Sequence, residues 1–135
     1  MLRDVRAENE GQGAVSTVDE RGRPRVLACA GCRRVITSDA DRIEMNGSHE
    51  HTLDNPDGER FRIGCFANAS GLLRIGRSSL EATWFAGYSW QSEVCAGCRV
   101  FLGWLYRRDG RTASPLGDHR FHGLILDGLV EVDEN

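Results

Sequence analysis

Short apolar runs alternate with turn-forming clusters along most of the chain, starting at about Val26. The turn signals recur about every eight to twelve residues and include MNGS at 45–48, NPDG at 55–58 and RDG at 108–110. Strands separated by turns at this spacing are typical of all-β domains. The pattern therefore predicts an antiparallel β domain.

Three segments have the length and the aromatic or β-branched content of strands. They are residues 60–63 (RFRI), 100–106 (VFLGWLY) and 121–126 (FHGLIL). No segment carries a strong helical periodicity. The predicted fold class is mostly β.

A chain of 135 residues fits one domain. Residues 1–25 mix Gly, Ser and charged residues without a period, which predicts a flexible N-terminal tail. We expect the folded domain over residues 26–130 and a short acidic C-terminal tail over residues 131–135.

Charge and composition argue against nucleic acid and membranes as partners. All seventeen basic residues are arginine, they are scattered, and the net charge is -3, so nucleic acid is not an expected partner. No stretch approaches the roughly 18 apolar residues of a membrane span, and the charged N-terminal segment lacks an export signal. We expect a cytoplasmic protein without a membrane partner. Five cysteines in a reducing compartment favour metal ligation plus one spare thiol.

The sequence Cys-Ala-Gly-Cys occurs twice, at Cys29–Cys32 and at Cys95–Cys98. The Gly before the second Cys is expected to allow a tight turn that aims both sulfurs at one point. Four thiolates make a closed tetrahedral site that suits a structural zinc ion. A redox-active CxxC or a disulfide pair is the alternative, which two matched motifs disfavour.

All three tryptophans lie close to the second CxxC. Trp104 and Tyr106 are two positions apart on a predicted strand and so share a face, and Gly87 allows a turn between Trp84 and Trp90. Such indole walls could enclose a compact neutral ring or an organic cation. The alternative is that the tryptophans simply form the core of a small β domain.

The order of motifs resembles the CULT domain, which is the thalidomide-binding domain of cereblon and of its single-domain bacterial relatives. The motifs are CxxC, HEH at 49–51, NPxG at 55–58, WFxGYxW at 84–90, CxxC, LGWxY at 102–106 and FxGLI at 121–125. The resemblance covers about residues 26 to 130.

The resemblance implies a β-tent fold, in which two antiparallel sheets meet at a steep angle and are pinned by one structural zinc ion. It also implies a binding module and not an enzyme. The implied ligands are cyclic imides, namely glutarimide rings of the thalidomide type, uracil-like rings and peptides that end in a cyclic imide.

The resemblance assigns the ligand-binding residues by motif position. The implied cage walls are Trp84, Trp90 and Trp104. Beside them stand Tyr106 and the capping residues Asn55 and Pro56, and the backbone of Ala82 and Trp84 would read the imide edge. Relatives often carry a larger side chain where this chain has Ala82. No docking segment for a cullin ligase adaptor is expected in this chain.

Two other functions remain as alternatives. A methionine sulfoxide reductase of the B type would need a reactive cysteine, and only Cys65 is left for that role. A Yippee-type interaction module also carries paired CxxC motifs. Cys65 lies among apolar residues and is expected to be buried and inert. His49, His51, His119 and His122 are expected to be packing or surface residues and not metal ligands.

Overall fold

The computed structural model describes residues 18–108 and 119–133. The predicted tail residues 1–17, 134 and 135 and most of the 108–110 turn lie outside these described residues. The described part of the chain forms two antiparallel sheets, which confirms the predicted mostly-β fold class. Two short 3₁₀ turns accompany them, η2 (Asp39–Asp41) and η3 (Leu126–Gly128). No helix in this part is long and apolar enough for a membrane span.

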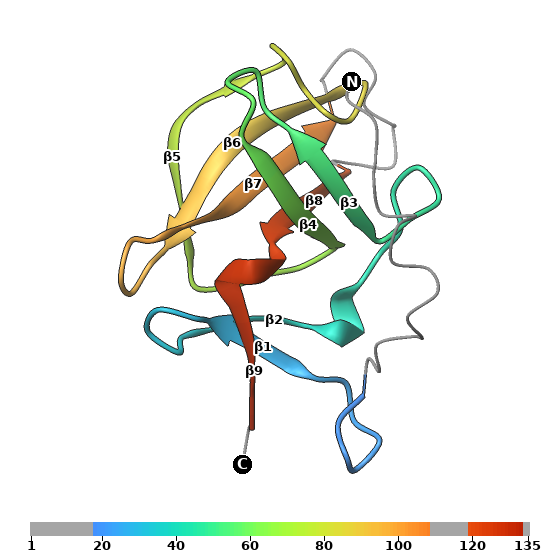
Figure 1. The fold of residues 1–135 in the computed structure, drawn as a ribbon, viewed down its shortest axis with the longest axis vertical. Helices are drawn as coiled ribbons and strands as arrows, with labels where there is room; N and C mark the ends of the chain where they lie inside the picture. The colour runs from blue at the N-terminus through green and yellow to red at the C-terminus, as the bar shows by residue number, and fades with distance from the viewer. Residues whose placement is uncertain (1–17, 109–118, 134–135) are drawn as a thin grey trace.

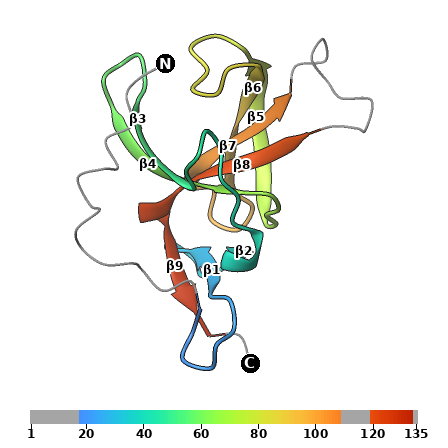
Figure 2. The same cartoon turned by 90° about the vertical axis from the view of Figure 1, so that its right-hand side faces the viewer.

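The larger sheet has six strands in the order β3-β4-β8-β7-β6-β5. Their bounds are β3 (Glu50–Asp54), β4 (Arg60–Phe66), β5 (Leu72–Ser79), β6 (Tyr88–Cys95), β7 (Phe101–Arg108) and β8 (Arg120–Ile125). The three strand segments predicted from the sequence are confirmed in β4, β7 and β8. In Figure 1 this sheet lies above the smaller one, and Figure 2 shows the β3–β4 hairpin diverging from β5 and β6.

The smaller sheet has the order β2-β1-β9, with β1 (Val26–Cys29), β2 (Val35–Ser38) and β9 (Leu129–Val132). Val26 pairs with Val132 across β1 and β9. The sheet therefore extends two residues into the segment that the sequence analysis assigned to the C-terminal tail, because Glu131 and Val132 pair with Leu27 and Val26. Among residues 18–25, Val18 and Pro24 form an isolated bridge, and Arg25 pairs with the buried Asp39 at 2.6 Å.

Two clusters of buried side chains form the core. One gathers side chains from the larger sheet and the β5–β6 loop and contains Leu53, Ile63, Cys65, Trp84, Phe85, Tyr88, Tyr106 and Phe121. The other joins the two sheets and contains Leu27, Cys29, Ile36, Phe66, Cys95, Leu102 and Leu124. Period-2 alternation explains much of this burial, as in β3, where every second residue is buried.

Candidate functional site: a four-cysteine centre and an aromatic cavity

Four cysteine sulfurs meet where β1 and β6 end. Their Sγ atoms all lie within 4.8 Å of one another, with Cys29–Cys98 at 3.6 Å and Cys32–Cys95 at 3.5 Å. A disulfide would need about 2.05 Å. Zinc with tetrahedral thiolates at about 2.3 Å has S···S edges of roughly 3.8 Å. The cluster therefore fits one structural zinc ion, as the two CxxC motifs predicted.

The two CxxC turns have the same backbone conformation. Arg33 and Arg99, which follow the second Cys of each turn, have φ of 69° and 70°. The N–H of Arg33 donates to the carbonyl of Cys29 at 2.8 Å, and that of Arg99 donates to Cys95 at 2.9 Å. The left-handed residue of each turn is therefore an arginine, and not the glycine that the sequence analysis had expected to enable the turn.

The glycines of the two motifs instead leave room for sulfur. A Cβ on Gly31 would lie 3.3 Å from the Cys98 Sγ, and a Cβ on Gly97 would lie 3.1 Å from the Cys32 Sγ. Both contacts reach across to the opposite turn. Each glycine thus allows the other turn to approach closely enough to complete the cluster.

Backbone N–H groups help the sulfurs to carry negative charge. Burial acts to raise the pKa of Cys95, but hydrogen bonds from the backbone N–H groups of Cys98 and Gly97 prevail and lower it to about 6. Burial raises the pKa of Cys29 to about 11. Cys95 thus favours the thiolate near neutral pH, whereas Cys29 does not, and thiolate is the form that binds metal.

A metal ion here would act as a cross-link. Cys32 and Cys95 are 63 positions apart in the chain; Cys32 lies in the turn between β1 and β2 of the smaller sheet, and Cys95 ends β6 of the larger sheet. Four protein ligands leave no position for substrate or water. The centre is therefore suited to holding the two sheets together and not to catalysis.

A cavity of about 450 Å³ opens beside the larger sheet. Its lining residues are Asn55, Pro56, Asp57, Glu59, Phe61, Glu81, Ala82, Trp84, Trp90, Ser92, Phe101, Trp104 and Tyr106. All seven residues that the resemblance assigned to ligand binding are among them. The fold thus brings these residues together from the β3–β4 hairpin, the β5–β6 loop and strands β6 and β7.

The three tryptophans contribute to this cavity in different ways. Trp84 is buried and belongs to the core, whereas Trp90 and Trp104 are half-buried and pack against it. Trp84 and Trp104 meet edge to face, with ring centroids 4.9 Å apart. Trp84 is therefore largely a core residue, as the core alternative expects. Trp90 and Trp104 are only partly buried and present the rest of their rings to the cavity.

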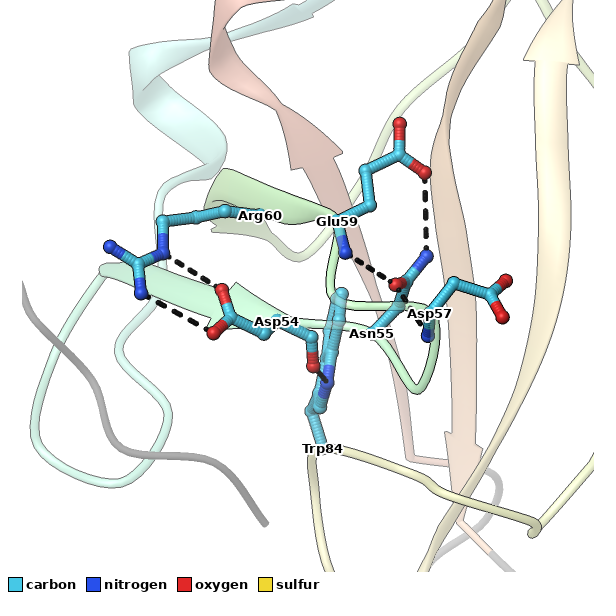
Figure 3. Close-up of polar contacts among 6 residues, drawn as sticks. All are labelled: Asp54, Asn55, Asp57, Glu59, Arg60 and Trp84. Carbon is cyan, nitrogen blue, oxygen red and sulfur yellow. Dashed lines mark hydrogen bonds and ion pairs between the residues drawn. The ribbon is translucent and has the colours of Figure 1, made fainter.

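Hydrogen bonds hold two of the indoles in place. The Nε1–H of Trp84 donates to the carbonyl of Asp54 at 3.0 Å, as Figure 3 shows. The Nε1–H of Trp90 donates to the carbonyl of Glu81 at 2.8 Å. The first bond ties the β5–β6 loop, which Figure 2 shows reaching toward the β3–β4 hairpin, to the end of β3.

The hairpin loop at 55–59 is organised by one amide side chain. The Oδ1 of Asn55 accepts from the N–H groups of Asp57 at 3.0 Å and Glu59 at 2.9 Å. Gly58 has φ of 84°, which an L side chain rarely adopts. The NPDG sequence therefore forms a well-defined turn that places Asn55 and Pro56 at the cavity.

Two backbone groups at the cavity are left without partners. Ala82 has φ of 54°, in the left-handed region. Within residues 18–108 and 119–133, neither the carbonyl of Ala82 nor the N–H of Trp84 forms a hydrogen bond. This loop therefore offers one acceptor and one donor that a ligand could use.

The sequence analysis missed several residues of the cavity, among them Phe61, Phe101 and three acidic side chains. Phe61 contacts Trp104 edge to face at 5.2 Å and Trp84 at 6.2 Å. Alternation along 60–63 could have assigned Phe61 to one face of a strand. No local signal could have shown that this face meets the tryptophans.

A buried hydrogen bond between an imidazole and a carboxyl side chain also went unnoticed in the sequence. The Nδ1 of His122 lies 2.7 Å from an Oε1 of Glu93, and both side chains are buried. Glu93 on β6 pairs with Gly103 of β7, and the next strand, β8, carries His122. The Glu93 side chain therefore reaches past β7 to the imidazole, and Gly103 itself is needed for the close approach of β8, because a Cβ there would lie 2.2 Å from the carbonyl oxygen of Gly123.

The remaining predicted thiol and histidines lie outside the metal cluster. Cys65 is fully buried, and this burial raises its pKa to about 12. The ring nitrogens of His49 and His51 contact backbone carbonyls, and His119 contacts the hydroxyl of Tyr88. Burial, and then the charge of Arg42, lowers the pKa of His49.

Fold and site together define a small all-β domain with a four-cysteine metal centre and an aromatic cavity. No protein-family model matches the chain. Three curated proteins are similar to it: protein cereblon of Danio rerio, at 34% identity over 76 residues, of Gallus gallus, at 32% over 76, and of Xenopus tropicalis, at 31% over 75. These alignments cover 56% of this chain and 16–17% of the relatives. They support a cereblon-like CULT domain.

Proposed function

We propose that this chain is a non-catalytic, zinc-containing binding module that captures cyclic imides between Trp84, Trp90 and Trp104. The observation that carries the proposal is the aromatic cavity of about 450 Å³, which is within the usual range of small-molecule sites. The candidate ligands are glutarimide rings of the thalidomide type, uracil-like rings and peptides with a C-terminal cyclic imide. The similarity to cereblon supports the same choice.

The polar pattern of the loop is complementary to an imide. An imide edge presents acceptor, donor and acceptor in sequence, and its ring CH₂ groups can pack on indole faces. The free carbonyl of Ala82 would accept the imide N–H, and the free N–H of Trp84 would donate to one imide oxygen. Both groups belong to the backbone, so the small side chain of Ala82 does not remove them.

Binding without catalysis agrees with the state of Cys65. A reductase of the methionine sulfoxide type needs an accessible thiolate, whereas Cys65 is buried and its pKa is raised to about 12. The metal cluster, with its four protein ligands, leaves no position for a reacting group. In this proposal neither a nucleic acid nor a membrane is a partner, no cullin adaptor is needed, and the protein acts in the cytoplasm.

A titration with glutarimide, followed by tryptophan fluorescence and calorimetry, tests the proposal. We expect saturable binding by the zinc-loaded protein. N-methylglutarimide, which lacks the imide N–H, should bind at least tenfold more weakly. Trp104→Ala should abolish binding and retain one zinc per chain.

The two variants separate binding from folding. If Trp104→Ala unfolds the chain, Trp104→Phe serves as the second variant, because it keeps an apolar ring and removes one wall. Unchanged fluorescence and no heat at millimolar glutarimide with the folded protein would refute the proposal.

A further inference from the structure

The mouth of the aromatic cavity carries charges of one sign. Three acidic residues, Asp57, Glu59 and Glu81, are among the described residues that line the cavity, and no basic residue is. All three side chains are exposed to solvent. The cavity therefore opens at a negatively charged rim, although arginine is frequent elsewhere in the chain.

The nearest arginine in the hairpin does not neutralise this rim. Arg60 pairs with Asp54 through contacts of 2.8 Å and 3.3 Å. In Figure 3 this pair lies on one side of Trp84, and the carboxylates of Asp57 and Glu59 lie on the other. The Arg60 charge is thus compensated by Asp54, which leaves the rim its own negative charge.

The rim carboxylates are held on defined backbone. The Asn55 turn fixes Asp57 and Glu59, and the Nδ2 of Asn55 also donates to Glu59 at 3.4 Å. Glu81 stands next to Ala82, and its N–H donates to the Oγ of Ser79 at 2.9 Å. Ala82 itself also lines the cavity and is exposed, and its methyl side chain adds little bulk there.

We infer that this rim selects cyclic imides that carry a positively charged group, an ammonium or a guanidinium, on the part that projects from the ring. The inference rests on the proposed function, because it concerns the substituent and not the ring. A cation that emerges between the two loops faces three carboxylates, whereas an anion there meets the same charges as repulsion.

The expected size of the effect is moderate. Exposed ion pairs change affinity about two- to fivefold each, so three carboxylates together give on the order of tenfold at low salt. Mobile ions screen exposed charges, with a Debye length of about 3 Å at 1 M salt. The preference should therefore contract at high ionic strength.

Three glutarimides that differ only in the end group of one short chain provide the test. The end groups are an ammonium, a neutral hydroxyl and a carboxylate, and the dissociation constant of each is measured by calorimetry at 50 mM and at 1 M NaCl. We expect the ammonium ligand to bind about tenfold more tightly than the hydroxyl ligand at low salt, and the carboxylate ligand to bind most weakly. At 1 M NaCl the three should agree within about threefold.

Variants assign the preference to the rim. In the triple variant Asp57→Asn, Glu59→Gln, Glu81→Gln the ratio of hydroxyl to ammonium dissociation constants should fall to about one. Glu131→Gln, an exposed residue on β9 outside the cavity, should keep the tenfold ratio. Peptides that end in a cyclic imide after Lys or after Glu show whether the cation can come from a polypeptide as well as from a small molecule.

The outcomes separate the two proposals. If all three glutarimides bind equally at low salt, or if the triple variant keeps the tenfold ratio, the inference about the rim is wrong and the imide site stands. If none of them binds to the folded, zinc-loaded protein, the proposed function is wrong and the inference falls with it.

Discussion

Trp84 is bonded to Asp54 across 30 positions of the chain, through an indole N–H that donates to a backbone carbonyl at 3.0 Å. The bond joins the β5–β6 loop to the β3–β4 hairpin, which together carry most of the cavity wall. Trp84 is therefore both a core residue and the side chain that sets the spacing of these two loops.

Replacing Trp84 by Phe should remove the hydrogen bond between these two loops and destabilise the protein. The variant keeps an apolar ring but leaves the Asp54 carbonyl without its partner, so we expect a loss of about 1–3 kcal/mol in the free energy of unfolding. Trp90→Phe is the matched control, because Trp90 is half-buried and its bond to Glu81 is exposed, and it should cost less. Urea denaturation measures both values, and equal losses would contradict the assignment.

Cys95→Ser should remove the metal and unfold the domain. Zinc centres of this type contribute apparent binding energies of about 10–16 kcal/mol near neutral pH. This equals or exceeds the whole free energy of unfolding of a typical protein, which is about 5–15 kcal/mol. Metal analysis and circular dichroism check the result. Cys65→Ala, which alters the buried thiol outside the cluster, should keep one zinc per chain. A folded, metal-free Cys95→Ser protein would show that the cross-link is dispensable.

The hydrogen bond between Glu93 and His122 should stabilise the protein more than the exposed ion pair of Arg60 and Asp54 does. Glu93→Ala leaves the buried imidazole of His122 without its hydrogen-bond partner at 2.7 Å, and leaving a buried polar group unsatisfied costs about 1–3 kcal/mol. Arg60→Ala, which breaks the exposed pair with Asp54, should cost about 1 kcal/mol or less. Chemical denaturation of the zinc-loaded variants gives both numbers, and similar losses would argue against a structural role for the buried pair.

Cys65 should make the protein less stable in alkali. Burial raises its pKa from 9.0 to about 12, so the unfolded chain releases this proton at lower pH than the folded chain. The contribution of the buried, protonated Cys65 thiol to the free energy of unfolding is fully present below pH 9 and is lost as the pH rises toward about 12. Cys65→Ala should flatten the fall in unfolding free energy over this range.

Alkylation gives a second measurement on the same thiol. Iodoacetamide at pH 8 should leave Cys65 unmodified in the folded protein and label it once the chain is unfolded, as mass spectrometry can show. Rapid labelling of Cys65 in the folded, zinc-loaded protein would reopen the reductase alternative.

The metal centre and several strands could be predicted from sequence because their signals are local. Two identical CxxC motifs identify the four metal ligands directly. Short runs of aromatic and β-branched residues predict β4, β7 and β8. The clustering of tryptophans near the second turn likewise pointed to the residues that line the cavity.

Other features depend on which strands lie side by side. β8 inserts between β4 and β7, so His122 of β8 comes within reach of Glu93 on β6, and Phe61 comes to lie against Trp104. The acidic rim forms because two loops far apart in the chain meet at one opening. Such contacts arise from long-range strand pairing, and no single stretch of residues encodes them. Local spacing in the sequence therefore identified the metal ligands and the indoles. Only the folded arrangement showed which residues lie next to them.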